Sequence, residues 1–347
     1  MSLVEKLLRI PQPVVHLLMS PGSVFSLYCL AFALLLAFAF LAVQQKRRRR
    51  RVRPRTIARA IFARRVLFHR STYADLGYFL IGTGTLGALF GSTVMSASAL
   101  TNLVAASLAH VFGPRAPLGA PDLVPRVAMT GALFLAYELG YFIDHSLKHR
   151  IPALWALHKT HHTAEVLTPL TSFRVHPLDS LIFANILTLV GGLFGGAVTY
   201  ALGQPIKEFA LDGTNVLLVA YIYLTAQLQH SQIWIPFTGA LGHVFLSPAH
   251  HQIHHSSDPA HYNRNMGASL AVWDWLFGSL EIPQLQSPRI KLGVRETEGA
   301  ASDPHSVTAL LLDPVVNAFG ALARRDPRGG GGDVARADTG PDAMTAA

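Results

Sequence analysis

The sequence contains very little cysteine and few charged residues. Cys29 is the single cysteine among 347 residues, which excludes an internal disulfide and an iron–sulfur cluster held by several thiolates. Charged residues make up 14% of the chain, whereas roughly a quarter is usual for a soluble globular domain. Any redox chemistry must therefore use ligands other than thiolate, and the shortage of charge points to a membrane protein.

Two metal-binding motifs are also absent. The sequence has no H-E-x-x-H, so a zinc metalloprotease would lack its general base. It has no E-x-x-H either, which argues against a carboxylate-bridged di-iron bundle. The stretch "GTGTLG" (Gly82–Gly87) has the spacing of a dinucleotide fingerprint, but it follows no expected strand and lies in an apolar run. We interpret it, like "GGLFGG" (Gly191–Gly196), as small residues for helix contact.

Long apolar runs predict the fold. Ser23 to Val43 are 21 residues without a charge, and a bilayer core requires about 20. Residues 96–112 are apolar but shorter, so an interfacial or re-entrant segment is expected there, with a crossing left open. We therefore predict an all-α, polytopic membrane helix bundle with about five spans. Besides the first run, the expected spans are 73–95, 127–143, 181–202 and 211–228.

Positive charge is concentrated in "KRRRRRVRPR" (Lys46–Arg55), directly after the first apolar run. Beside a membrane helix, such a run is typical of a cytoplasmic anchor that faces anionic lipid headgroups, and no nucleic-acid partner is expected. Counting the spans from this anchor places His145, His149 and His230 on the cytoplasmic side. The prediction is a multi-pass integral membrane protein with a histidine-rich helical cap and its active site on the cytoplasmic face.

Composition divides the chain into three parts. Residues 1–70 are expected to form the N-terminal anchor helix and the basic segment, and residues 71–283 the membrane domain with the histidines. Residues 284–347 are polar and are expected to be a largely disordered tail, with a short amphipathic helix at 306–323.

The sequence is rich in histidine, with 17 residues, of which 13 lie between positions 145 and 261. One H-x-x-x-H and two H-x-x-H-H repeats have spacings that place imidazoles on one face of a helix. These histidines exceed the four ligands of one tetrahedral zinc and suit two metals with four or five nitrogens each and an open position. A haem cytochrome would instead place single histidines deep within paired spans, so a di-iron centre is favoured. The expected ligands are His145, His149, His158, His161, His162, His230, His251, His254 and His255.

The residues around these histidines carry a family resemblance. The segments "ELGYFIDHSLKH" (Glu138–His149), "FRVHPLD" (Phe173–Asp179), "QHSQIWIP" (Gln229–Pro236) and "NRNMGASLAVWDWLFG" (Asn263–Gly278) accompany the repeats in order. Over about residues 127–283 the chain resembles the fatty acid hydroxylase/sterol desaturase family of membrane non-haem di-iron enzymes.

The resemblance implies an O₂-dependent lipid hydroxylase or desaturase that oxidises an unactivated C–H bond with two iron ions, O₂ being a co-substrate. Zinc is expected to be able to replace iron in recombinant protein. Because the chain has no cysteine cluster of its own, the electrons must come from an external reductase with a ferredoxin or cytochrome. The pattern does not separate hydroxylation from desaturation, and it identifies neither the lipid nor the residues that bind it. A non-catalytic metal- or haem-binding membrane protein and a zinc-dependent membrane hydrolase remain alternatives.

Metal-bound imidazoles need a hydrogen-bond partner for their second ring nitrogen. The candidates for this role are Glu138, Asp144, Asp179 and Asp274. The resemblance adds His176, from the "HP" element, as a structural or outer residue.

Overall fold

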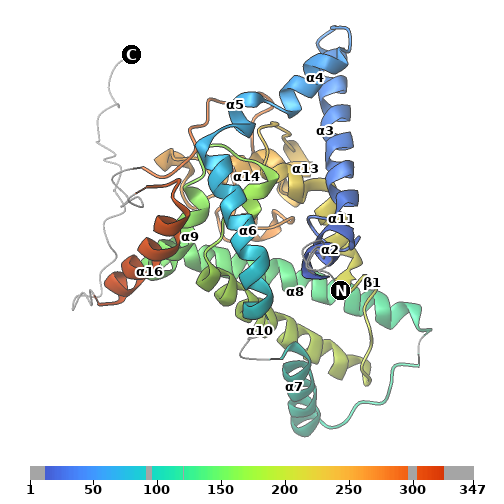
Figure 1. Cartoon of the computed structure of the whole chain (residues 1–347). Helices are drawn as coiled ribbons and strands as arrows, with labels where there is room; N and C mark the ends of the chain where they lie inside the picture. The colour runs from blue at the N-terminus through green and yellow to red at the C-terminus, as the bar shows by residue number, and fades with distance from the viewer. Residues whose placement is uncertain (1–11, 91–95, 120, 296–302, 324–347) are drawn as a thin grey trace, which may run out of the picture.

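The computed structural model describes residues 12–90, 96–119, 121–295 and 303–323, and these ranges are mostly helical (Figure 1). The predicted all-α class is confirmed. The strands within these ranges, β1 (Ala210–Leu211) and β2 (Thr214–Asn215), form a small antiparallel hairpin.

The helices vary widely in length, from single turns to 28 residues. In chain order they are α2 (Gln12–Met19), α3 (Leu27–Arg47), α4 (Pro54–Ile61), α5 (Arg64–Leu67), α6 (Arg70–Phe90), α7 (Ala97–Phe112), α8 (Leu123–Arg150), α9 (Pro152–His162), the 3₁₀ turn η1 (Pro169–Phe173), α10 (Pro177–Leu202), α11 (Val216–Tyr221), the π-helical turn η2 (Ile222–Ala226), α12 (Gln227–Gln229), α13 (Gly239–Val244), α14 (Pro248–His254), η3 (Pro259–His261), α15 (Val272–Leu276) and α16 (Val307–Ala323).

Three of the described helices, α3, α8 and α10, are long and apolar enough to cross a membrane. The expected span at 73–95 falls on α6 and continues into residues 91–95, which lie outside the described ranges. The expected span at 211–228 is wrong as a single helix. Asp212 and Gly213 adopt positive φ values of 50° and 78° and turn the β-hairpin, so the apolar helix begins only at Val216 and is shorter than 18 residues.

Glycines allow α7 and α10 to pack closely. A Cβ atom at Gly192 would lie 2.7 Å from the Leu100 side chain, and one at Gly196 would lie 2.5 Å from Cβ of Val104. Close backbone approach of this kind is the usual role of small residues between apolar helices, so the interpretation of "GGLFGG" is confirmed. The "GTGTLG" stretch lies within helix α6, which excludes the strand–loop–helix geometry of a dinucleotide site there.

The two H-x-x-H-H repeats lie on the short helices α9 and α14 and, for the second repeat, at the residue that follows α14. Proline is the first residue of α9 and of α14, a position that has no backbone N–H to satisfy. Ser247 caps α14, and the His250 ring accepts a hydrogen bond from the Ser247 backbone N–H in return. In Figure 1, α8 and α10 run across the lower part of the view, while α9 and α14 lie above them.

Part of the predicted tail is folded. The expected helix at 306–323 is confirmed as α16, which packs against α9 and buries Leu310 completely. The Trp234 indole N–H donates to the Gln284 carbonyl, and the Lys291 carbonyl accepts from the Ser257 backbone N–H. The folded region therefore continues past residue 284. The predicted disorder at 324–347 lies outside the described residues.

Candidate metal centre

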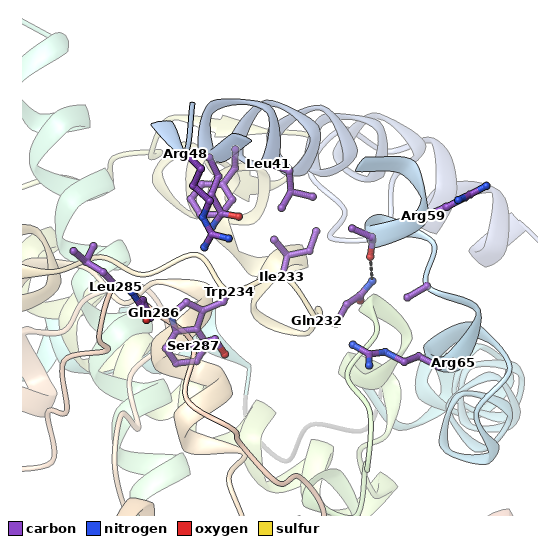
Figure 2. A pocket seen from close by; sticks show the side chains of 14 residues that line it. Leu41, Arg48, Arg59, Arg65, Gln232, Ile233, Trp234, Leu285, Gln286 and Ser287 are labelled. Carbon is purple, nitrogen blue, oxygen red and sulfur yellow. Dashed lines mark hydrogen bonds between the residues drawn. The ribbon is translucent and has the colours of Figure 1, made fainter. Parts of the chain in front are cut away.

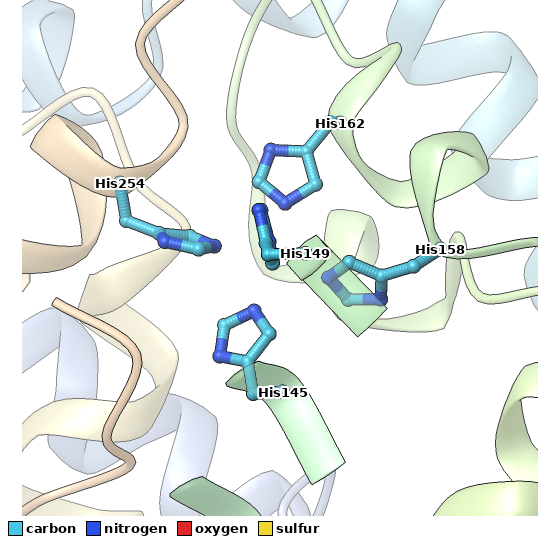
Figure 3. A group of neighbouring side chains, drawn as sticks. All are labelled: His145, His149, His158, His162 and His254. Atoms are coloured by element: carbon cyan, nitrogen blue, oxygen red, sulfur yellow. The ribbon is translucent and has the colours of Figure 1, made fainter. Parts of the chain in front are cut away.

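Nine histidines converge in two groups, one of five and one of four. Each member offers one ring nitrogen, and within each group these atoms lie within 4.8 Å of one another. Figure 3 shows the rings of the first group directed toward a common centre. The five-histidine group is His145, His149, His158, His162 and His254, and the four-histidine group is His161, His230, His251 and His255. All nine residues expected from the sequence are brought together.

Helical geometry divides each H-x-x-H-H repeat between the two groups. On α9, His158 and His162 enter the five-histidine group while His161 enters the other. On α14 the relation is reversed: His251 and His255 share the four-histidine group, and His254 joins the five. Residues four apart in a helix differ by about 40° around its axis, whereas adjacent residues differ by about 100°. The expectation that each repeat projects in one direction was therefore too simple, because each repeat bridges both groups.

The buried nitrogen atoms fit a metal at both positions. In the five-histidine group, Nε2 of His149, His158, His162 and His254 is buried without a hydrogen-bond partner. In the four-histidine group, Nε2 of His230 lies 3.1 Å from that of His161 and 2.9 Å from that of His251. A neutral imidazole has one donor and one acceptor nitrogen, so several converging Nε2 atoms satisfy one another poorly. A shared cation removes this conflict.

The charge state of the rings also suits a metal. Burial lowers the pKa of His230 and of His254 to about 3. It also lowers the pKa of His161, His251 and His255 well below the ordinary histidine value. These rings are therefore neutral at physiological pH, which is the form that binds metals. Nitrogen sites of this type suit iron or zinc.

In the five-histidine group, hydrogen bonds at Nδ1 orient several of the rings. The Nδ1–H of His145 donates to the Met266 carbonyl at 2.8 Å, and that of His254 donates to the Arg264 carbonyl at 2.9 Å. Nδ1 of His158 lies 3.0 Å from a carboxylate oxygen of Asp179. In each ring this arrangement leaves Nε2 for a metal. Asp179 thus occupies the position expected of an orienting carboxylate.

A buried chain of charges extends from Asp179. Its carboxylate pairs with the Lys148 ammonium group, whose Nζ also lies 2.6 Å from Oδ2 of Asp144. All three side chains are almost completely buried. Asp144 is therefore linked to His158 through Lys148 and Asp179 rather than by direct contact. The sequence analysis did not identify Lys148, although its i, i+4 spacing from Asp144 was a usable signal.

Glu138 and Asp274 hold a loop instead of a histidine ring. Glu138 accepts hydrogen bonds from the backbone of Ser269 and Leu270. Asp274 accepts from the Met266 and Gly267 backbone at 2.7 and 2.8 Å. Within the described ranges neither carboxylate bonds to an imidazole. Both instead fix the loop whose Met266 carbonyl accepts the hydrogen bond from His145.

His176 caps helix α10 and lies outside both groups. Its Nδ1 accepts from the Leu178 backbone N–H, and its Nε2 lies 3.0 Å from the Leu311 carbonyl of α16. The ring therefore joins the start of α10 to the C-terminal helix. This is the structural alternative expected for it.

Fewer hydrogen bonds orient the rings of the four-histidine group. The Ser172 hydroxyl lies 3.0 Å from Nδ1 of His230, whereas Nδ1 of His161 and of His255 is buried without a partner among the described residues. Ser172 lies in η1, next to Arg174, whose buried guanidinium pairs with Asp75 of α6 at 3.0 Å. Arg174 belongs to the segment "FRVHPLD", but no sequence motif marks Ser172 or Asp75, because their contacts with His230 and Arg174 span 58 and 99 positions.

An apolar cavity of about 570 Å³ reaches both groups. His145 and His158 of the first group and His161 and His230 of the second form part of its wall. The remaining wall is mainly aromatic and aliphatic, and includes Phe25, Tyr78, Tyr141, Phe173, Phe183 and Tyr221. Its wall combines residues from Gly22 to Leu311, which lie far apart in the chain, so no local sequence pattern identifies the residues that would bind a substrate.

Comparison with known proteins finds a family match over part of the chain. Residues 130–279 match the fatty acid hydroxylase family model. The chain is 27% identical to the alkylglycerol monooxygenase of Danio rerio over 150 residues, 42% of this chain and 29% of the relative. For the Homo sapiens alkylglycerol monooxygenase the identity is 28% over 148 residues, 43% of this chain and 29% of the relative.

A second type of relative is the Delta(7)-sterol 5(6)-desaturase erg3C of Aspergillus fumigatus. It is 26% identical over 166 residues, which are 46% of this chain and 51% of the relative. The chain thus matches less than a third of the alkylglycerol monooxygenases and about half of the sterol desaturase. No solved structure matches the chain. The resemblance predicted from the sequence is confirmed.

Proposed function

We propose that the protein is an O₂-dependent membrane lipid hydroxylase or desaturase that oxidises an unactivated C–H bond with two iron ions. The observation that carries this proposal is that two groups of largely buried histidines converge, and that both groups contribute rings to the wall of one apolar cavity. An apolar cavity with a few convergent polar groups is typical of a small-molecule site. The names of the relatives, a monooxygenase and a sterol desaturase, support lipid oxidation.

Each histidine group would hold one ion. When bound, iron supplies the reduction of O₂ to an oxidant able to remove hydrogen from the lipid. The chain's own residues keep the rings neutral, orient them through Nδ1 and leave an apolar space that excludes water beside them. Zinc precedes ferrous iron in the usual affinity order, so recombinant protein is expected to carry some zinc.

The site is proposed to face the cytoplasm and to receive electrons from an external reductase with a ferredoxin or cytochrome. Three residues after His230, Ile233 packs against Ala37 of α3. The Gln232 amide donates to the Ala60 and Ile61 carbonyls of α4. Because these contacts lie toward the arginine-rich end of α3, they support a common compartment for the basic run and the histidines. Positive residues beside a span favour the cytoplasmic side.

The geometry gives less support to the alternatives. A catalytic zinc ion takes three protein ligands and a water, whereas here five and four nitrogens converge. A bis-histidine haem would use two axial nitrogens on opposite faces of a planar macrocycle, whereas here further imidazoles converge on the same centre, where the macrocycle would have to lie.

Lipid turnover tests the proposal. Metal-replete protein in a lipid bilayer is supplied with a reductant system and isotopically labelled O₂, and the lipids are analysed by mass spectrometry. Labelled oxygen in the product identifies hydroxylation, and loss of two hydrogen atoms identifies desaturation. The matched variants are His254→Ala, which removes a proposed ligand, and His243→Ala, which changes an exposed ring. Product formed without O₂, or by His254→Ala at the normal rate, would contradict the proposal.

A further inference from the structure

A second cavity, of about 620 Å³, lies beside the segment that follows His230. Figure 2 shows it between the end of α3, the connection from α4 to α5, and the segments around Trp234 and Ser287. Gln232, Ile233 and Trp234 form one wall, whereas no histidine lines it. It is therefore separate from the cavity at the metal centre.

Three arginines from three elements line this cavity: Arg48 at the end of α3, Arg59 on α4 and Arg65 on α5. In Figure 2, Arg48 and Arg65 extend inward from opposite sides, while Arg59 points away from the rim. Among the described residues, no carboxylate lines the cavity. Across the described residues, the arginines with an acidic partner are Arg70, Arg174 and Arg264. Arg48 and Arg65 thus present uncompensated positive charge to one space.

The cavity changes from apolar to cationic along α3. Phe40 and Leu41 belong to the apolar, span-length part of this helix, Gln44 follows one turn later, and Arg48 lies at its end. A guanidinium group can contact two phosphate oxygens at once. Apolar side chains leading into a cationic end match a molecule with an acyl chain and a phosphate.

The neighbouring helix has the character of an interfacial segment. On α4, Ile57 is buried while Arg55 and Arg59 are exposed. Phe62 and Phe68, which follow it, are 53% and 63% exposed. Exposed aromatic side chains among arginines are typical of chain that lies at a membrane surface. This places the cationic end of the cavity where phospholipid headgroups are found.

We propose that this cavity binds one anionic membrane phospholipid, whose phosphate contacts Arg48 and Arg65 and whose acyl chain follows Phe40 and Leu41. Occupancy links α3, α5 and the Gln232–Trp234 wall, and that wall continues directly from His230. A bound lipid therefore stabilises the segment that carries one proposed metal ligand. The proposal does not depend on the oxidation reaction.

Native mass spectrometry of the full-length protein tests it. Protein stripped of lipid in detergent is exposed to an equal mixture of phosphatidylglycerol and phosphatidylcholine, and the retained lipid is counted. We expect preferential retention of one phosphatidylglycerol. The double variant R48Q/R65Q should weaken this retention about thirtyfold, since each arginine near a membrane contributes roughly 1 kcal/mol. Both positions are exposed, so folding should be preserved.

The matched control is R50Q/R51Q, which removes the same charge from the basic run outside the cavity. It should change retention by no more than about twofold. An equal loss in this control would mean diffuse attraction to the run and would overturn the proposal. Displacement of the lipid by millimolar inorganic phosphate would identify a free-phosphate site instead. Unchanged lipid retention in R48Q/R65Q, with loss of reductase-dependent turnover, would identify an acidic protein partner and would also overturn it.

Discussion

The two histidine groups share helices α9 and α14, yet they differ in the hydrogen bonds that their rings make through Nδ1. In the five-histidine group, three rings bond through Nδ1 to fixed acceptors: the Met266 and Arg264 carbonyls and the Asp179 carboxylate. In the four-histidine group only the Ser172 contact to His230 is comparable, and two rings have an unpartnered Nδ1 within the described ranges.

This difference has a chemical consequence. Hydrogen bonds to the second ring nitrogen fix the tautomer and raise the basicity of a metal-binding imidazole. We therefore expect the five-histidine group to be largely formed without a metal, whereas the four-histidine group should rely more on an ion for order. We expect the first position to hold its ion tightly and the second to exchange it and to change its ligands more readily.

Removing one ligand from either group should have the largest effect. His254→Ala and His255→Ala should each lower turnover by about a thousandfold or more, because the metal contributes several kcal/mol to catalysis. Metal analysis should show the loss of one ion per chain in each variant. For His255→Ala, the remaining ion should be the tightly held one.

The control for these variants is His243→Ala, since this exposed ring bonds only within its own helix turn, to the Gly239 carbonyl. It should keep both ions and normal turnover. If His254→Ala and His255→Ala retain two ions each, the two groups are not separate metal positions.

Asp179→Asn should have the next largest effect, and this effect should differ between the two histidine groups. The substitution leaves Lys148 with one buried partner and removes the carboxylate from His158. Breaking a buried ion pair costs about 3–5 kcal/mol of folding free energy, and losing an orienting partner lowers metal affinity about 10–100-fold. Only the five-histidine group should lose affinity, as measured by metal titration, while denaturant unfolding reports the stability.

Asp122→Asn serves as the comparison for Asp179→Asn, because Asp122 is exposed and makes no side-chain capping bond. It should change neither the metal affinity nor the stability appreciably. Equal loss of affinity at both metal positions in Asp179→Asn would mean that the two groups do not differ in the way proposed.

Metal removal should proceed at different rates in the two groups. A chelator is expected to extract the ion of the four-histidine group first and that of the five-histidine group later, which gives two phases in released metal. The metal-free protein should unfold at a lower temperature. At a free-ion concentration of a thousand times the Kd, binding stabilises the fold by about 4 kcal/mol. His255→Ala should lack the fast phase. A single phase in the unsubstituted protein would contradict the assignment.

Ser172→Ala should have the smallest effect. It removes the hydroxyl that contacts Nδ1 of His230 and should lower metal affinity about tenfold, at the four-histidine group alone. The loss of one hydrogen bond should cost about 1 kcal/mol of stability. Ser98→Ala, at an exposed position on α7, is the matched control. A change in the slow phase of metal release instead of the fast one would place Ser172 in the wrong group.

Local sequence patterns were sufficient to identify the nine histidines that converge and much of the helical framework. The nine histidines were identifiable because helical spacing and the coordination chemistry of imidazole are both short-range properties. The small residues of "GGLFGG" were interpreted correctly for the same reason. The span expected at 211–228 was wrong, because apolar composition outweighed a turn formed by only two residues, Asp212 and Gly213.

By itself, the sequence determined that helical segments present nine imidazoles and that apolar helices accompany them. Only the tertiary structure decided how these imidazoles divide, with His161 of α9 in one group and His158 and His162 in the other. It also brought Ser172, Lys148 and the Asp75–Arg174 pair to the site, and it built the apolar cavity from segments between Gly22 and Leu311. The physical reason is that spacing fixes directions within one helix, whereas contacts between helices distant in the chain depend on how their surfaces pack.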